Sequence, residues 1–225
     1  MMKIVVRIGG SVIASPPNPE IIQRYADLIR ELRSRGHEVA VIVGGGVLAR
    51  EFIDLARKLG LSEQEQDELA ISVSRLLAQL LAMKVEGYQW RKIPVNVEEA
   101  VRDLGESGIV IMGGIKPGMT TDTVAALIAS EIKADLIIKA TDQDGIYTKD
   151  PRKYPDARKL DEVSFSELEE LLAESRHRAG IHQIIDPEAV RVLKEKNIKT
   201  IVVNGFKPEN LLLAVNGAGI GTVIH

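Results

Sequence analysis

The chain has 225 residues, 45% of them hydrophobic, and a formal net charge of −3. This length suits one α/β domain with a sizeable core, or two small lobes that share a sheet. The mild acidity argues against a general nucleic-acid-binding protein, which would show a basic stripe, and the absence of cysteine excludes disulfides and thiolate chemistry.

Predicted elements alternate between strand and helix from end to end. Asn18 before Pro19 is typical of a helix start, Ser62 with Glu65 forms a capping box, and Asp186 precedes Pro187 in the same way. In chain order we predict a strand at 3–8, a helix from 19 to Gly36, a strand at 38–43, helices at 47–59 and about 62–86, a strand at 109–114, a helix at 123–134, a strand at 135–140, a helix from Ser164 to about 174, a helix from 187, a strand at 199–203, and a last helix and final strand. The pattern predicts a sandwich with a mostly parallel central sheet.

Composition also limits location and partners. The four histidines form no HExxH motif and no pair at helical spacing, so we expect no protein metal site. No apolar run approaches the roughly 18 residues of a membrane span, and the first apolar run is too short for a signal peptide. We therefore expect a cytoplasmic protein that binds neither membrane nor nucleic acid.

Several predicted strands end in glycine or polar residues. Ligands bind beyond the carboxyl ends of strands in an open parallel sheet, and glycine lets the backbone approach them closely. A helix N-terminus after the glycines favours an anion. Two phosphorylated ligands lying head to head would need several such ends, which points to phosphoryl transfer; a tight turn without ligand is the alternative for the triple glycine. These ends are Gly9-Gly10-Ser11, Gly44-Gly45-Gly46, Gly113-Gly114 and Thr141-Asp142.

Other well-known motifs are absent from the sequence. It contains no GxxxxGK[ST], no GxGxxG and no GxSxG, which argues against a P-loop kinase, a dinucleotide-binding unit and a hydrolase elbow. The DQDG segment at 142–145 lacks the spacing of a calcium-binding EF-hand.

Four segments in this order resemble the amino acid kinase superfamily and, within it, the compact archaeal type of UMP kinase: KIVVRIGGS (3–11), VGGGVLARE (43–51), MGGIKPGMTTDTVAALIA (112–129) and KATDQDGIYTKDP (139–151). The resemblance covers essentially the whole chain. It implies one domain, 1–225, with a three-layer αβα sandwich, mainly UMP-binding in its N-terminal part and mainly ATP-binding over roughly 135–225. The implied reaction is Mg²⁺-dependent transfer of the ATP γ-phosphoryl group to UMP, giving UDP and ADP in pyrimidine nucleotide (CTP) biosynthesis.

The resemblance also implies roles for individual residues. The implied catalytic residues are Arg7, Asp122 and Asp186. Residues implied to bind ATP are Gly9, Gly10, Ser11, Gly46, Arg50, Thr141, Asp142, Gly145, Tyr147 and Asp150. Residues implied to bind UMP are Gly45, Asp67, Ile115, Lys116, Pro117, Gly118, Met119, Thr120 and Thr121.

Several of these residues have an equally simple structural explanation. Asp67 and Asp122 are also carboxylates of a first helical turn, which the helix dipole favours. Lys116 is equally an exposed loop lysine and Tyr147 a packing residue, while Asp186 is a complete N-cap.

Two residues depart from the family pattern. Arg7 stands where many members carry lysine, and a guanidinium contacts phosphate as a planar fork rather than as a point charge. Ile115 stands where relatives often carry threonine, so one hydroxyl is missing.

The resemblance further implies Mg²⁺ held mainly by ATP phosphates and water, and a homo-oligomer, commonly a hexamer. The leucine-rich helix near 63–86 is either a subunit interface or plain core packing. Rival acceptors within the fold are isopentenyl phosphate, carbamate and an amino-acid carboxylate. A non-catalytic nucleotide- or oxyanion-binding protein is the rival from another class.

Overall fold

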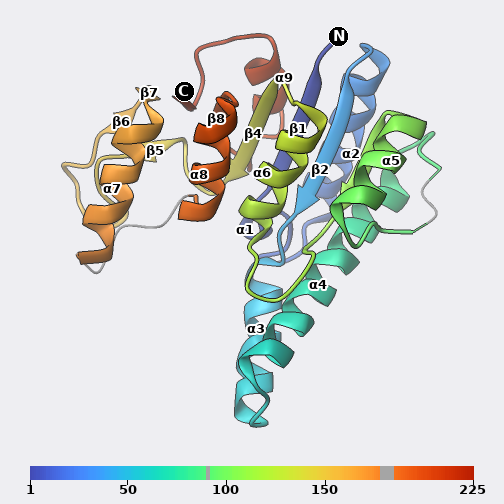
Figure 1. Ribbon diagram of the computed structural model, residues 1–225, viewed down its shortest axis with the longest axis horizontal. Helices are drawn as coiled ribbons and strands as arrows, with labels where there is room; N and C mark the ends of the chain where they lie inside the picture. The colour runs from blue at the N-terminus through green and yellow to red at the C-terminus, as the bar shows by residue number, and fades with distance from the viewer. Residues whose placement is uncertain (90–91, 178–184) are drawn as a thin grey trace.

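A computed structural model describes residues 1–89, 92–177 and 185–225. They form a three-layer sandwich with helices on both faces of a seven-stranded sheet (Figure 1). The strand order is β3-β2-β1-β4-β8-β9-β7, and every pair is parallel except β8 with β9. The predicted fold class is confirmed. The strands are β1 (Lys3–Ile8), β2 (Glu38–Val43), β3 (Ile109–Met112), β4 (Leu136–Thr141), β7 (Glu162–Val163), β8 (Thr200–Asn204) and β9 (Thr222–Ile224).

The sheet separates two hydrophobic clusters. Apolar side chains of the central strands alternate between the faces, as expected for strands covered on both sides. One face packs against α1 (Gly10–Ile13), α2 (Pro19–Ser34), α4 (Glu63–Lys84) and α9 (Asn210–Val215). The other packs against α5 (Val97–Ser107), α6 (Thr121–Ile132), α7 (Phe165–His177) and α8 (Pro187–Lys196).

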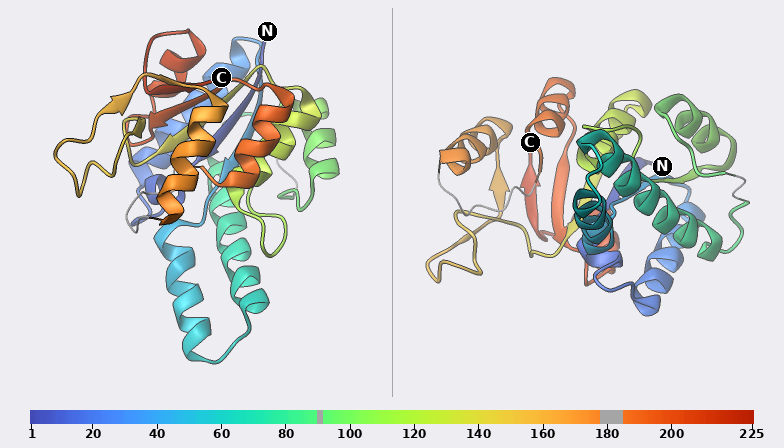
Figure 2. Two further views of the ribbon diagram at one scale, coloured as in Figure 1. Left: turned by 60° about the vertical axis from the view of Figure 1, so that its left-hand side comes forward. Right: turned by 90° about the horizontal axis from the view of Figure 1, so that it is seen from below.

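The remaining long helix, α3 (Gly46–Lys58), pairs with the first half of α4. The two run antiparallel and project beyond the carboxyl ends of the strands, as the left view of Figure 2 shows. This hairpin therefore forms one wall of the region where the strand ends meet.

Helix capping explains several boundaries. The Asn18 side chain accepts hydrogen bonds from two backbone N–H groups at the start of α2, and Ser62 and Glu65 form the expected capping box. Asp186 accepts from the N–H of Ala189 at the start of α8. These predictions are confirmed.

The structure also contains elements that the patterns did not predict. Helix α5 begins after Asn96, whose side chain accepts from the Glu99 N–H, and ends at Gly108, where φ is 74°. A two-stranded sheet of β5 (Ile146–Tyr147) and β6 (Lys159–Leu160) lies outside the main sheet. Among the described residues, no helix is long and apolar enough to cross a membrane.

Candidate active site

Two cavities meet at the carboxyl ends of the strands. The first, here called the basic cavity, has a volume of about 350 Å³, and the second, the loop cavity, about 420 Å³. Gly45 and Thr121 line both. The basic cavity is lined by Arg7, Gly10, Ser11, Gly44, Gly45, Gly46, Arg50, Thr121, Asp122, Lys139, Thr141, Asp142, Gln143 and Arg152. The loop cavity is lined by Gly45, Ala49, Asp67, Ala70, Ile71, Ser74, Gly114, Lys116, Gly118, Met119, Thr120 and Thr121.

Two glycine turns pack against each other at the floor of the basic cavity. A Cβ on Gly10 would lie 1.9 Å from the backbone nitrogen of Gly46, and one on Gly46 would lie 2.2 Å from the carbonyl oxygen of Gly10. Gly46 also adopts φ +61°, which side chains disfavour. Backbone contact between the ends of β1 and β2 therefore requires glycine here before any ligand is considered.

A group of three charges lies beside these turns, with Lys139 buried and Arg7 and Asp122 partly exposed. Parallel pairing of β1 with β4 places Arg7 opposite Lys139, and Asp122 comes from the first turn of α6. The Asp122 carboxylate lies 2.7 Å from Arg7 Nε and accepts a hydrogen bond from Lys139 Nζ at 2.5 Å. The contact with Arg7 is close, yet Arg7 Nε and Asp122 Oδ1 form no aligned hydrogen bond with the described residues. The Asp122 carboxylate thus forms ion pairs with both Arg7 and Lys139.

Burial and charge shift the pKa values of this group. Burial alone raises the pKa of Asp122, but Arg7 and then Lys139 outweigh it, so the pKa lies below its ordinary value. Burial lowers the pKa of Lys139 most strongly, and Arg7 lowers it further. Asp122 reverses this only in part, which leaves the pKa of Lys139 at about 8. Lys139 is therefore still mostly protonated at neutral pH.

Sequence reasoning missed Lys139 and Arg152. A lysine inside the apolar strand DLIIKA was a usable signal, because lysine is almost never buried without a partner. Its partner could not be read from the sequence, since Asp122 comes from α6 and reaches Lys139 only in the folded chain. Arg152 lies 3.6 Å from Asp142 and 3.4 Å from Asp150. Arg50 is exposed and forms no ion pair with any described residue.

The loop between β3 and α6 forms the roof of the loop cavity. Asp67 on α4 accepts a hydrogen bond from the Gly118 N–H at 2.7 Å. Thr120 caps α6 by accepting from the Thr123 N–H at 3.1 Å, and Thr121 accepts from Arg7 Nη2 at 3.0 Å. The predicted acceptor-side residues are thus mostly brought together. Ile115 and Pro117 do not line the cavity, and Ile115 packs against the cluster beneath α5 and α6.

Asp186 lies behind the start of α6. Its carboxylate caps α8 and accepts hydrogen bonds from the hydroxyls of Thr120 and Thr123. It lines neither cavity. Its position links two helix N-termini, and a direct part in the chemistry stays a prediction.

Four residues predicted to bind ATP lie away from the wall of the basic cavity: Gly9, Gly145, Tyr147 and Asp150. A Cβ on Gly145 would lie 2.5 Å from Thr222 Oγ1, so close packing accounts for this glycine. Tyr147 pairs with Lys159 in the small sheet. Asp150 is buried and accepts from the Arg152 N–H at 3.0 Å, which shapes the turn. A role in binding ATP stays a prediction for all four.

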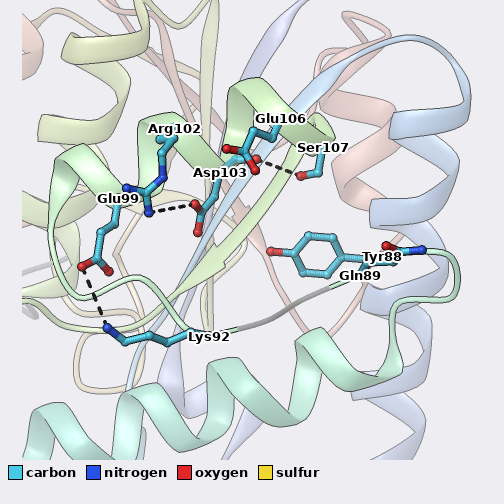
Figure 3. A pocket seen from close by; sticks show the side chains of 8 residues that line it. All are labelled: Tyr88, Gln89, Lys92, Glu99, Arg102, Asp103, Glu106 and Ser107. Atoms are coloured by element: carbon cyan, nitrogen blue, oxygen red, sulfur yellow. Dashed lines mark hydrogen bonds and ion pairs between the residues drawn. The ribbon is translucent and has the colours of Figure 1, made fainter.

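A third cavity, of about 500 Å³, lies beside α5 and contains none of the predicted residues (Figure 3). Four of its charged side chains form two pairs: Arg102 lies 3.3 Å from Asp103, and Lys92 lies 3.9 Å from Glu99. The Tyr88 ring lies among them, and burial followed by the charge of Asp103 raises its pKa.

The described residues contain no group of three or more histidine, cysteine, aspartate or glutamate side chains placed to hold a metal ion. One of the four histidines, His182, lies outside the described residues. In the basic cavity, Asp122 forms ion pairs with Arg7 and Lys139. The partly exposed Asp142 forms its ion pair with Arg152 at the longer distance of 3.6 Å, so it is the carboxylate more available to a metal ion.

Known proteins resemble this chain over its full length. The model of the amino acid kinase family matches residues 2–204. A uridylate kinase from Methanothermobacter thermautotrophicus is 43% identical over 223 residues, 99% of each chain, and one from Methanocaldococcus jannaschii is 42% identical over 226 residues, 100% of each. The crystal structure of uridylate kinase from Archaeoglobus fulgidus superposes with a TM-score of 0.90 at 40% identity, covering all of both chains. The chain therefore belongs to the amino acid kinase family and, within it, to the uridylate kinases.

Proposed function

We propose that this protein transfers the γ-phosphoryl group of ATP to UMP, giving UDP and ADP, a step of pyrimidine nucleotide synthesis. One observation carries the proposal: a cavity rich in cations lies next to a second cavity, and Gly45 and Thr121 line both. Two phosphorylated ligands lying head to head require this arrangement, because their reacting groups must meet in line.

The basic cavity suits the ATP phosphates. Its wall carries Arg7, Arg50, Lys139 and Arg152 against the carboxylates of Asp122 and Asp142, so cations are in excess. Charge developing on transferring oxygens is stabilised by fixed donors of this kind. Residues on both sides of position 135 form this wall, whereas the loop cavity is lined only by residues up to Thr121. This division supports an acceptor site in the N-terminal part of the chain.

Asp122 organises the cations rather than removing a proton. The UMP phosphate is already anionic at neutral pH, so the attacking oxygen needs no general base. Asp122 holds Arg7 and Lys139 side by side before any nucleotide binds. The ion pair with Asp122 and the hydrogen bond to Thr121 hold the Arg7 guanidinium at the wall of the basic cavity, where its remaining N–H donors can bind a phosphate oxygen.

The loop cavity suits the smaller nucleotide. Gly45, Ala49 and Ala70 leave room beside the loop, and Asp67 lies at its edge, where it can accept from ribose hydroxyls. Thr120, Thr121 and the N-terminus of α6 face the cavity, which favours an anion there.

The donor set fits a magnesium ion that arrives with the nucleotide. Asp142 can supply one carboxylate oxygen, and phosphates and water would supply the rest, as Mg²⁺ usually prefers. When bound, the ion neutralises phosphate charge. Arg7, Lys139 and the glycine N–H groups remain the donors that this chain itself contributes.

We further infer a cytoplasmic homo-oligomer, with the hexamer as the expected form. The α3–α4 hairpin carries large apolar side chains that no described residue covers, which supports a subunit interface. Light scattering on the purified protein tests this, and a monomer at micromolar concentration would contradict it. The exposed fractions are 42% for Phe52, 53% for Leu55, 70% for Leu59, 60% for Leu76, 45% for Leu80 and 56% for Met83.

The activity is tested by ADP release from ATP with each candidate acceptor in turn: UMP, CMP, isopentenyl phosphate, glutamate and carbamate. We expect the highest kcat/KM with UMP and a requirement for Mg²⁺. Preference for another acceptor would overturn the choice of UMP. ATP binding without ADP release would favour the non-catalytic alternative.

A matched pair of variants locates the acceptor site. Asp67→Asn removes a carboxylate that lines the loop cavity, whereas Glu63→Gln alters an exposed carboxylate one turn earlier on α4. We expect only Asp67→Asn to raise KM for UMP, and neither to change KM for ATP. Equal effects of the two variants would argue against a ribose contact at Asp67.

A further inference from the structure

Helix α4 forms hydrogen bonds with the backbone of the loop that lines the loop cavity. The Arg75 side chain donates from Nε to the Gly114 carbonyl at 2.9 Å and from Nη2 to the Ile115 carbonyl at 2.8 Å. One guanidinium thus binds two consecutive carbonyl groups at the point where the chain leaves β3. Arg75 forms no ion pair with a carboxylate among the described residues, so its side-chain contacts here are with the loop backbone.

The neighbouring residue, Ser74, also forms a hydrogen bond with this loop. Ser74 accepts a hydrogen bond from the Gly114 N–H at 2.8 Å and donates to the Ile71 carbonyl at 2.7 Å. Both Ser74 and Gly114 line the loop cavity. The contact therefore lies in the wall of the proposed UMP site.

The paired glycines after β3 have a packing reason. A Cβ on Gly113 would lie 2.7 Å from the Arg75 backbone nitrogen and from Ser74 Oγ, and one on Gly114 would lie 3.1 Å from Ile71 Cγ1. The glycines let β3 approach α4 so closely that these side chains reach the loop backbone. Asp67, two turns earlier on α4, holds the far end of the loop through the Gly118 N–H.

We propose that Arg75 is a positioning residue for the acceptor: it sets the path of residues 114–118 and thereby the affinity for UMP, while the ATP side is unaffected. The proposal rests on the proposed function. Arginine binds the two carbonyls with two nitrogens of one rigid fork, whereas lysine keeps the charge but carries all its donors on a single nitrogen, so we expect lysine to replace arginine poorly here.

Steady-state kinetics on Arg75→Lys and Arg75→Gln test the proposal. We expect both to raise KM for UMP about tenfold or more, the effect of losing one charge-assisted hydrogen bond, with KM for ATP within about twofold of wild type. Arg33→Lys is the matched control, because Arg33 donates to the Ser107 carbonyl at 3.2 Å, away from both cavities. It should leave both KM values unchanged.

Full activity of Arg75→Lys would overturn the proposal, since the positive charge alone would then suffice. Equal losses of affinity for UMP and ATP would also overturn it, because they would indicate a general structural role.

Hydrogen exchange on the unliganded protein gives a readout independent of activity. Peptides covering 113–119 should exchange faster in Arg75→Lys than in wild type, while peptides covering 125–132 should not change. Unchanged exchange over 113–119 would refute the positioning role. A wild type that fails to phosphorylate UMP would instead contradict the proposed function and leave this exchange measurement as the test of Arg75.

Discussion

Replacing the buried Lys139 by methionine tests the group of charges that it forms with Arg7 and Asp122. Burial and the neighbouring Arg7 lower the pKa of Lys139 from its ordinary 10.5 to about 8 in the folded protein. Because the folded-state pKa lies below the unfolded value, the unfolded chain binds more protons between pH 8 and 10.5. The free energy of unfolding must therefore rise with pH in that window.

The magnitude follows from the two pKa values. Below pH 8 the amine is charged in both states, and burying that charge lowers the free energy of unfolding by its full amount. This loss disappears as the pH rises and the amine loses its proton in both states. Between pH 7 and pH 10 this adds roughly 2–3 kcal/mol to the free energy of unfolding of the wild type. Lys139→Met has no amine to titrate and should lack this increment, so the difference between the two proteins should change by that amount.

Urea unfolding at pH 7, 8, 9 and 10 measures the effect, with all proteins at one concentration because assembly adds to apparent stability. Subtracting the Lys139→Met curve removes the contribution of other titrating groups. Lys58→Met, at an exposed position near the end of α3, is the control and should follow the wild type. A wild-type minus Lys139→Met difference that stays flat or falls toward pH 10 would refute the reasoning.

Two further predictions concern the charge group and the packing of glycines. Asp122→Asn leaves the buried Lys139 and the partly exposed Arg7 without an anion, so we expect a loss of about 3 kcal/mol in the free energy of unfolding at pH 7. Since the folded pKa of Asp122 is lowered, the difference from wild type in urea unfolding should shrink as the pH falls below its ordinary 3.8. Gly10→Ala places a Cβ 1.9 Å from the Gly46 backbone and should lower the free energy of unfolding by about 3 kcal/mol. Gly105→Ala lies in α5 with no atom within 4 Å of the new Cβ and should raise it by about 0.5–1 kcal/mol. Thermal unfolding measures both, and the opposite order of the two thermal midpoints would contradict both assignments.

Much of the architecture could be predicted from the sequence because it depends on local chemistry. Apolar runs bounded by glycine predicted β1 and β2, and the side chains of Asn18 and Ser62 marked helix starts by capping their own backbone. Helix α5 was missed although Asn96 and Gly108 carry the same kinds of signal. Its amphipathic stretch includes Gly105, a residue that weakens helix propensity.

The candidate site could be predicted only in part. Glycine-rich strand ends indicated the edge of the sheet where ligands bind, but not the purpose of each glycine. Gly10 and Gly46 pack against each other, and the missing side chain of Gly113 lets the end of β3 lie close to α4. These reasons depend on contacts between segments far apart in the chain.

The sequence by itself determined most of the order of strands and helices, the glycine-rich strand ends and the resemblance to a kinase family, since each depends on neighbouring residues. Only the tertiary structure decided which charges share a site. Parallel pairing brings Arg7 beside Lys139, and α6 inserts Asp122 between them. The fold also brings Arg75 onto the loop of the neighbouring cavity. A side chain's partners across the fold depend on strand register and helix packing, which local patterns do not specify.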